Sequence, residues 1–524
     1  MAWGERHIMK RLGWITVFWL IAVMNPARAV EYPDADTTAT LIYYNSAGNQ
    51  TLDPADPQNN SSYAHDALLA IYDTLIGLDN SGKPGPGLAR SWTRGGGLTE
   101  LTLKLRPDVV MHDGTPLTPA VVIQNFQRNI GLGKRAGSSV AETMALIAAM
   151  EAQGDDTVKL TLKVPSGQIE AWLGGTAGMM MSPAAFADGA VSATLRPIGG
   201  GPFKVKQFES NVRMITTRFD GYWGGIAGRP AAFEHHYVPD GRARLNAVRS
   251  GQATATLLDP RQIQEAKAAG LTVQVNEKNA FWVLYFNIKK AGLGDVRVRR
   301  AIMHALDREA LADALTFGSG RATGQMFASS SPLNIKALDS RYPFDPAKAK
   351  ALLEEAGFKN GIDLSTLTLN NSEFRPLAEA LQAMLADSGI RLKFDTIDVS
   401  QFPLFFLPPP RGDMLLGRFG GRGEAAQMLF ELVGTGGPFS PGGATSAAID
   451  RLIGEARLLE VTDPRRDDVL RQVVELASDT VSLAPIMTRA NVYAYRPGCI
   501  QNLEAYLPGG ADRFNDTRVG ARCH

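Results

Sequence analysis

Stretches with the two-residue period of strands and stretches with the period of helices are interspersed along this chain. Residues 101–106 (LTLKLR) and 158–164 (VKLTLKV) alternate apolar and polar side chains, as half-buried strands do. Residues 298–306 and 375–389 instead repeat apolar side chains every three or four positions, as amphipathic helices do. This mixture predicts an α/β or α+β fold with more than one lobe.

Capping signals mark where two of the helices begin and end. Asp345 suits an N-cap, Pro346 suits the first helical position, and Gly357 suits the C-terminal stop. By the same logic Pro376 starts the helix over 375–389.

The length and the charge of the chain limit its architecture and its partners. Its 524 residues allow two or more hydrophobic cores, because domains usually contain about 50–200 residues. The formal net charge of +1 provides no global field to attract nucleic acid or an anionic membrane. We therefore expect no nucleic-acid partner.

The N-terminus has the pattern of a secretory leader. An uncharged apolar run over 12–24 is too short to span a membrane comfortably, and Ala27-Arg28-Ala29 forms a small-x-small cleavage site. The basic residues that precede the apolar run are Arg6, Lys10 and Arg11. We expect a signal peptide over 1–29 and a periplasmic mature chain.

The two cysteines, Cys499 and Cys523, lie near the C-terminus. Neither stands beside the cleavage site, so a lipid-modified anchor is not expected. In an oxidising compartment they can form a disulfide that stabilises the fold by roughly 3 kcal/mol, and we favour this bond over two free thiols.

Motifs of enzyme active sites are missing from the sequence. There is no H-E-x-x-H or Cys/His cluster, no G-x-S-x-G elbow between a strand and a helix, and no G-x-x-x-x-G-K-[ST] loop. We expect no catalytic residues, no metal site and no cofactor. An extracytoplasmic hydrolase that uses paired carboxylates, such as Asp113 and Glu424, stays open as an alternative.

A series of short stretches follows one another in a recognisable order and spacing. They are LDP (52–54), IYDTL (71–75), PGLARSW (86–92), LTLKLRPDVVMHDGTPLT (101–118), GGGPFKV (199–205), FDGYWGG (219–225), RLNAVRSGQA (244–253), YFN (285–287), DVRVRRAIMHALDRE (295–309) and YPFDPAKAKALLEEAGF (342–358). Together they resemble the periplasmic solute-binding proteins of peptide-type ABC importers, which include dipeptide, oligopeptide, nickel and glutathione binders. The resemblance covers about residue 40 to about residue 490.

The resemblance implies an α/β, two-lobed periplasmic-binding-protein fold whose hinge motion encloses a ligand between the lobes. Residues 30–280 would form the first lobe, with a small extra subdomain over about 65–190. Residues 281–489 would form the second lobe, and residues 490–524 would return to the first. The implied partners are a peptide-like solute and the permease and ATPase subunits of an ABC transporter, with the binding protein itself a monomer.

Dipeptide-binding members of this family hold a peptide by its two ends, with an arginine on the carboxylate and an aspartate on the α-ammonium. The arginine corresponds to Arg375 in NNSEFRPLAEALQAML (370–385). Arg375 would stand at a helix N-terminus, where unpaired backbone N–H groups and the macrodipole favour an anion. We expect Arg375 to bind a carboxylate; an exposed arginine at a helix end is the alternative.

The aspartate of the family lies in a loop of the form G-W-x-G-D-x-G-D-P, and GRFGGRGEA (417–425) takes its place here. Arg418 replaces the tryptophan, Gly421 the first aspartate and Glu424 the second. The glycines that remain, and that predict a preserved backbone shape, are Gly417, Gly420 and Gly423.

Arg418 and Arg422 would repel an α-ammonium, and a buried ammonium without a partner is strongly destabilising. We therefore expect a solute that is anionic or lacks a free amine, such as an acidic, N-blocked or opine-like peptide derivative, or a sugar-phosphate conjugate. Alternatively, both arginines face solvent and Glu424 binds the ammonium. A receptor for a metal chelate or another non-peptide conjugate is the second reading on this scaffold.

The geometry of the family suggests further ligand contacts. From the loop we expect Phe419, Gly420 and Gly421 to take part. From the first strand we expect Tyr43 and Tyr44 to line the pocket, and Asn45 and Ser46 to donate hydrogen bonds.

Overall fold

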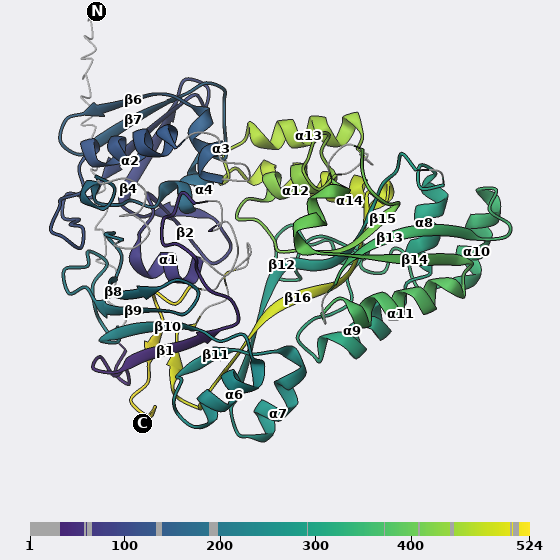
Figure 1. The fold of residues 1–524 in the computed structure, drawn as a ribbon. Helices are drawn as coiled ribbons and strands as arrows, with labels where there is room; N and C mark the ends of the chain where they lie inside the picture. The colour runs from purple at the N-terminus through teal and green to yellow at the C-terminus, as the bar shows by residue number, and fades with distance from the viewer. Residues whose placement is uncertain are drawn as a thin grey trace, which may run out of the picture.

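The structure, a computed structural model, describes residues 32–56, 59, 65–132, 139–187, 197–290, 292–370, 373–406, 409–440, 445–503, 506 and 513–523. The leader expected over 1–29 lies outside the described residues. The chain forms two lobes joined by two long strands, β12 (Thr272–Phe286) and β16 (Leu483–Tyr495), as Figure 1 shows. The expected α/β fold with two lobes is confirmed.

One ten-stranded sheet runs through both lobes. Strands β14, β13 and β15 belong to the second lobe, β12 and β16 cross between the lobes, and β11, β1, β10, β9 and β8 belong to the first lobe. The bounds of the lobe strands are β1 Thr40–Asn45, β8 Phe203–Glu209, β9 Arg213–Arg218, β10 Ala232–Tyr237, β11 Ala255–Leu257, β13 Ile362–Leu369, β14 Ile390–Ile397 and β15 Met414–Phe419.

Helices cover the sheet of the second lobe from two sides, with α12, α13 and α14 on one side and α9 and α11 on the other (Figure 1). Their apolar faces bury one core cluster together with the strands, and its members include Phe281, Leu381 and Leu470. The helices of this lobe are α8 Val296–His304, α9 Arg308–Thr316, α10 Pro346–Glu355, α11 Arg375–Ala386, α12 Ala425–Val433, α13 Ala447–Arg457 and α14 Pro464–Asp479.

The first lobe carries a separate four-stranded sheet in the order β4-β5-β7-β6, with its own core cluster. A hairpin of β2 and β3 connects this subdomain to the rest of the lobe. The other helices and strands of the first lobe, including those of this subdomain, are α1 His65–Ile71, β2 Ile76–Leu78, β3 Pro84–Pro86, β4 Ala89–Gly95, β5 Glu100–Leu105, α2 Pro119–Gly131, α3 Ser139–Leu146, β6 Ile147–Gln153, β7 Thr157–Leu162, α4 Ile169–Leu173, α6 Gly241–Arg249 and α7 Ile263–Ala268.

The two crossing strands are irregular where they pass between the lobes. Their register shifts between Glu277 and Phe281, where Glu277 pairs with Ala490 and Phe281 pairs with Thr488. Such an irregularity bends paired strands locally. We propose that the lobes divide within these strands, near residues 280 and 489.

The local signals in the sequence are confirmed where they can be checked. Strands β5 and β7 fall on the two alternating stretches, and helix α10 begins after Asp345, whose side chain accepts a hydrogen bond from the N–H of Lys348. Helix α11 begins at Arg375, directly before Pro376. These features depend on neighbouring residues, which is why the sequence alone predicts them.

The C-terminal segment packs against the first lobe. Strands β17 (Ile500–Gln501) and β18 (Arg518–Val519) pair with each other, and Cys499 and Cys523 are joined by a disulfide with an S–S distance of 2.22 Å. Both cysteines belong to the same core cluster as Leu41 and Tyr43 of β1. The segment is therefore part of the core of this lobe.

His235 is buried in an aromatic cluster of the first lobe. Its ring stacks on Tyr43 at 5.0 Å and lies 4.7 Å from Tyr237, and neither ring nitrogen has a hydrogen-bond partner. The carboxylate of Asp66 lies 3.6 Å from Nε2, beyond hydrogen-bond reach. Burial, helped by His236, lowers the pKa of His235 to about 3.

We expect His235 to make the protein less stable in acid. The folded-state pKa of about 3 lies below the ordinary value of 6.5, so the unfolded chain binds a proton that the folded chain does not. The stabilising effect of neutral His235 is complete above pH 6.5 and is lost as the pH falls toward 3, by about 1.4 kcal/mol per pH unit.

Urea unfolding between pH 4 and pH 7 tests this prediction. His235→Phe should reduce the dependence of the unfolding free energy on pH by about one proton. His236→Phe, on the half-buried opposite face of β10, should change the pH dependence much less, because His236 is only the smaller cause of the lowered pKa of His235. Equal pH dependence in wild type and His235→Phe would contradict the prediction.

Candidate functional site

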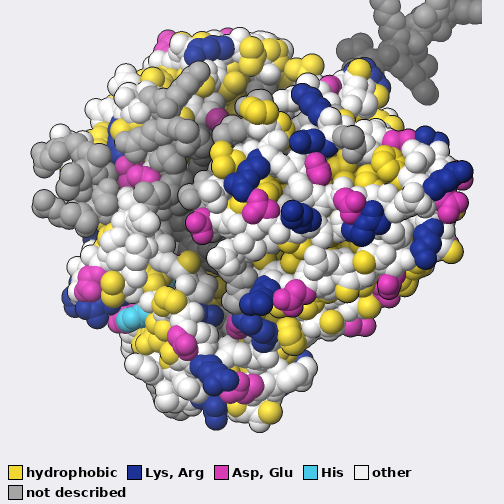
Figure 2. Space-filling view, turned by 45° about the vertical axis from the view of Figure 1, so that its right-hand side comes forward, with side chains coloured by type: hydrophobic (Ala, Val, Ile, Leu, Met, Phe, Trp, Pro, Cys, Tyr) yellow, Lys and Arg dark blue, Asp and Glu magenta, His cyan; other side chains and the backbone are white. Residues whose placement is uncertain are grey.

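A cavity of about 150 Å³ lies between the two lobes. The first lobe contributes the turn between β2 and β3, the crossing strand β12 contributes Asn279, and the second lobe contributes loops and helix ends. The lining residues are Ser81, Gly82, Lys83, Asn279, Phe327, Ser331, Pro332, Leu333, Arg422, Gly423, Glu424, Ala425, Met428, Val461, Arg466 and Asp467. Figure 2 shows the surface hollowed between the two halves. The cavity is smaller than the roughly 300–1,000 Å³ of drug-sized pockets, so it suits a small solute.

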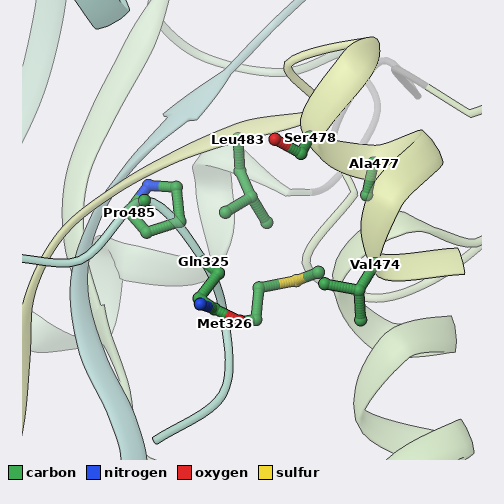
Figure 3. A pocket seen from close by; sticks show the side chains of 8 residues that line it. Gln325, Met326, Val474, Ala477, Ser478, Leu483 and Pro485 are labelled. Carbon is green, nitrogen blue, oxygen red and sulfur yellow. The ribbon is translucent and has the colours of Figure 1, made fainter. Parts of the chain in front are cut away.

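A second cavity, of about 10 Å³, lies inside the second lobe. Figure 3 shows Met326, Val474 and Leu483 pointing into it. Its volume is about that of one water molecule, so it cannot hold a solute.

The topology of the second lobe places the glycine-rich loop at the larger cavity. Strands β13 and β15 run parallel, so their carboxyl ends share one edge of the sheet. The loop follows β15 at this edge and contributes Arg422 and Gly423 to the cavity wall. Ligands of open α/β sheets usually bind outside the carboxyl ends of the strands.

Glu424 has a structural role. Its side chain caps helix α12 by accepting hydrogen bonds from the N–H groups of Ala426 and Gln427, at 3.0 and 2.8 Å. It also forms an ion pair with Arg466, and both side chains are almost completely buried. Glu424 lines the cavity, and both of its carboxylate oxygens already accept hydrogen bonds from the start of α12.

Arg422 lines the cavity, but its charge is paired. Its Nε lies 2.6 Å from a carboxylate oxygen of Glu431, and its guanidinium stacks over the rings of Phe419 and Phe439 at 5.0 and 5.4 Å. Burial, then Glu431, raises the pKa of Glu142 on α3, while Arg422 opposes this shift. Arg422 therefore interacts electrostatically with two carboxylates, Glu142 of the first lobe and Glu431 of the second.

We expected Phe419 to contact the ligand, but it is a core residue, only 2% exposed, and is not part of the cavity wall. Its ring packs against Phe281 and Phe439. Successive side chains of a strand point to opposite faces, which explains why Arg418 leaves the sheet on the other side. There Arg418 binds the carboxylate of Glu373 at 2.6 Å.

The glycines of the loop have different reasons to be glycine. A Cβ on Gly417 would lie 2.8 Å from the ring of Tyr285, so the close packing of β15 on β12 requires it. Gly421 has a φ of +78°, a conformation that other residues rarely adopt. A Cβ on Gly420 or Gly423 would meet no atom within 4 Å, so close packing does not require glycine at these two positions. The residue that replaces the family's aspartate is thus the one whose backbone needs glycine.

Arg375 projects into solvent at the start of α11. Its side chain is 80% exposed and pairs with Glu379 one helical turn later. Exposed pairs of this kind contribute little to stability. The structure therefore corresponds to the alternative that we left open, an exposed arginine at a helix end.

The residues expected from β1 also lie outside the cavity lining. Tyr43 is buried against His235 and Phe514, and Tyr44 is half-buried beside His236. Asn45 is buried and donates a hydrogen bond to Asp66 at 3.2 Å, while its own side chain accepts from the N–H of Ser46. Asn45 and Ser46 thus fix the end of β1 through these two hydrogen bonds.

Sequence reasoning missed most of the cavity wall. Lys83 follows the turn signal DNSG (79–82), and Asp467 lies in the first turn of α14, so each looked like an ordinary surface residue. Only the approach of the lobes places them on one cavity. The turn at 79–82 was the available signal, because loops that carry function are often short turns on rigid elements.

Residues 83–422 match the family described as bacterial extracellular solute-binding proteins, family 5. This span is more than half of the chain. The chain belongs to this family. Family 5 proteins are the periplasmic solute-binding components of ABC transporters, and they bind small solutes and work with permease and ATPase subunits.

A family 5 relative supports this assignment across much of the chain. The glutathione-binding protein GsiB of Pectobacterium atrosepticum is 27% identical over 395 residues, which cover 73% of this chain and 74% of the relative. The same fold occurs in HbpA2 of Haemophilus parasuis, with a TM-score of 0.80 at 22% identity over 92% of this chain and 100% of that one. It also occurs in DppA of Helicobacter pylori in complex with the peptide STSA, with a TM-score of 0.75 at 20% identity over 92% and 98% of the two chains. The periplasmic-binding-protein fold is therefore confirmed.

The two carboxylates considered for a hydrolase are both held by hydrogen bonds in this family 5 protein. Asp113 accepts hydrogen bonds from Ser182 and from the N–H of Thr115, at 2.6 and 3.0 Å. Burial would raise its pKa, but these hydrogen bonds lower it, whereas a proton donor needs a raised one. Glu424 is already held by Arg466.

The described residues contain neither a cluster of metal ligands nor a membrane-spanning helix. Within the described ranges, no group of three or more His, Cys, Asp or Glu side chains is arranged to hold a metal. In the same ranges, no helix is both long enough and apolar enough to cross a membrane.

Proposed function

We propose that this family 5 protein binds a small peptide-like solute that is anionic or lacks a free amine. The observation that carries the proposal is the state of Glu424. It is the only acidic residue of the loop over 417–424, and its oxygens are held by the start of α12 and by Arg466. In the loop that binds an α-ammonium in dipeptide-binding members, the one carboxylate of this chain is therefore already held by an arginine and by the start of a helix.

Two cations at the cavity also support an acidic solute, although the carboxylate of Asp467 lines the same cavity. Lys83 is exposed at the rim on the first lobe, and Arg422 lines the wall on the second. A carboxylate between them would approach a cation from each lobe, which favours closure on an anion. The relative from Pectobacterium atrosepticum is named for glutathione, a peptide with two carboxylates and one amine, which makes glutathione the first probe.

We further propose that the chain is exported by its leader, acts in the periplasm as a monomer without a lipid anchor, and releases its solute unchanged to a permease. Release requires that the open and closed states differ in affinity. Incubating the mature protein with glutathione, followed by mass spectrometry of the solution, tests for chemical change. Product formation would favour an enzyme instead.

Calorimetric titration of the mature protein with three probes tests the ligand class. We expect glutathione and N-acetyl-dialanine to bind at least about tenfold more tightly than dialanine, because only dialanine combines a free amine with a single carboxylate. Native mass spectrometry of the protein purified from its own periplasm would show retained cargo directly.

Tighter binding of dialanine would overturn the proposal. In that case Asp467, which lines the cavity from α14, would be the ammonium partner. Asp467→Asn would then abolish dialanine binding, whereas the proposal predicts no loss of glutathione affinity in this variant.

A further inference from the structure

Two arginines and a tryptophan form a row on one face of the sheet. Trp282 on β12 is the register partner of Arg418 on β15 and of Met487 on β16. Arg489 follows Met487 by two positions, so it shares this face. Its guanidinium lies 5.8 Å from the centre of the Trp282 ring. Strands β15, β12 and β16 are neighbours in the sheet, as Figure 1 shows.

The carboxylate of Glu373 binds both arginines of this row. One oxygen lies 2.6 Å from Arg418 and the other lies 3.4 Å from Arg489. Phe374, the next residue, packs edge-on against Trp282 at 4.8 Å. The backbone before α11 therefore holds Glu373 over the row.

This arrangement leaves positive charge in excess. Two guanidiniums share the carboxylate of Glu373, and the closest contact to each joins a different oxygen, at 2.6 and 3.4 Å. Arg261 of the first lobe is paired with Asp259 at 2.8 Å, and its pKa is raised first by Asp259 and also by Glu373. Solvent reaches the site, because the side chains of Arg418, Glu373 and Arg489 are 34%, 43% and 26% exposed.

We propose that Arg418 and Arg489 form a carboxylate-binding site. Glu373 occupies this site in the absence of solute, and an acidic group of the solute displaces it. A solute carboxylate can bind one guanidinium through two bonds while Glu373 keeps the other, or it can replace Glu373 on both. Solutes without an acidic group cannot make this exchange. The site thus selects for acidic solutes, and it deepens the proposed function by assigning the selecting residues.

Fluorescence of Trp282 provides a direct test, with succinate as the probe. Trp282 lies under the Arg489 guanidinium, so a carboxylate arriving there should change its emission, and Trp282→Phe should remove the change. Glu373→Gln keeps the shape of the side chain and removes the competing charge. We expect this variant to bind succinate about tenfold more tightly than wild type, equal to about 1.4 kcal/mol.

Substitution of an arginine should have the opposite effect. Arg489→Gln should weaken succinate binding at least about tenfold, and Arg489→Lys should give an intermediate loss, because lysine keeps the charge but not the planar fork. Glu379→Gln is the matched control: it removes the same charge from an exposed pair on α11. It should leave succinate binding within about twofold of wild type.

The outcomes separate this proposal from the proposed function. Equal succinate affinity in wild type, Glu373→Gln and Arg489→Gln would overturn the carboxylate site. If none of the peptide probes binds but succinate binding changes in the variants as predicted, the carboxylate site is supported and the proposal of a peptide-like solute is wrong. If Glu373→Gln and Glu379→Gln tighten binding equally, the effect is one of net charge and the assignment to Arg418 and Arg489 is wrong.

Discussion

Replacing Arg466 with methionine should lower the free energy of unfolding by about 3–5 kcal/mol. Arg466 is the ion-pair partner of Glu424, and their side chains are only 3% and 4% exposed. Its Nε also donates a hydrogen bond to the carbonyl of Ala456, at the end of α13, at 3.1 Å. The variant would leave a carboxylate buried without its counter-ion where α12, α13 and α14 meet. Urea unfolding monitored by circular dichroism measures the loss.

The neighbouring arginine offers a matched control. Arg465 pairs with Asp463 but is 75% exposed, so Arg465→Met should change stability by less than about 1 kcal/mol. The double variant Arg466→Met with Glu424→Gln should be more stable than Arg466→Met alone, because it removes the stranded charge. Equal losses for Arg465→Met and Arg466→Met would show that the buried pair has no special role.

Replacing Gly167 with alanine should weaken solute binding on the order of a hundredfold, equal to about 2.7 kcal/mol. Gly167 lies in the first lobe before α4, and its N–H donates to the carbonyl of Arg457, in the second lobe, at 2.8 Å. A Cβ on Gly167 would lie 2.0 Å from the carbonyl oxygen of Leu459. Backbone atoms cannot yield as a flexible side chain can, so the lobes must move apart.

The measurement combines calorimetry with small-angle X-ray scattering. With saturating glutathione, Gly167→Ala should keep a larger radius of gyration than wild type. Gly131→Ala is the control, since a Cβ at this exposed end of α2 meets no atom within 4 Å. Unchanged affinity and unchanged radius in Gly167→Ala would mean that this contact does not form when the protein holds its solute.

Much of the fold could be predicted from short stretches of sequence. The N-cap at Asp345, the proline after Arg375 and the alternation of residues 101–106 each report on a few neighbouring residues. The mixture of periods indicated an α/β protein, and the order of the family's stretches indicated its two lobes. The single sheet that runs through both lobes by way of β12 and β16 could not be predicted locally, because its strands are far apart in the chain.

The candidate site was predictable only in part. The loop at 417–424 was found because it stands where the family has its ammonium site, and Arg422 does line the cavity. Its charge partners could not be found in this way. Glu373 is 45 residues from Arg418, and Arg466 is 42 residues from Glu424. A charge pattern along the chain does not show which charges meet in space.

By itself, the sequence determined the class of this protein: its helices and strands, its lobed architecture and its membership of a family that binds solutes. Tertiary structure alone decided which of the loop's charges are available. Folding buried Glu424 against Arg466 and brought Glu373 onto Arg418 and Arg489. The physical reason is that helix and strand signals arise from neighbouring residues, whereas the energy of a charge depends on its burial and on its partners, which only the folded chain provides.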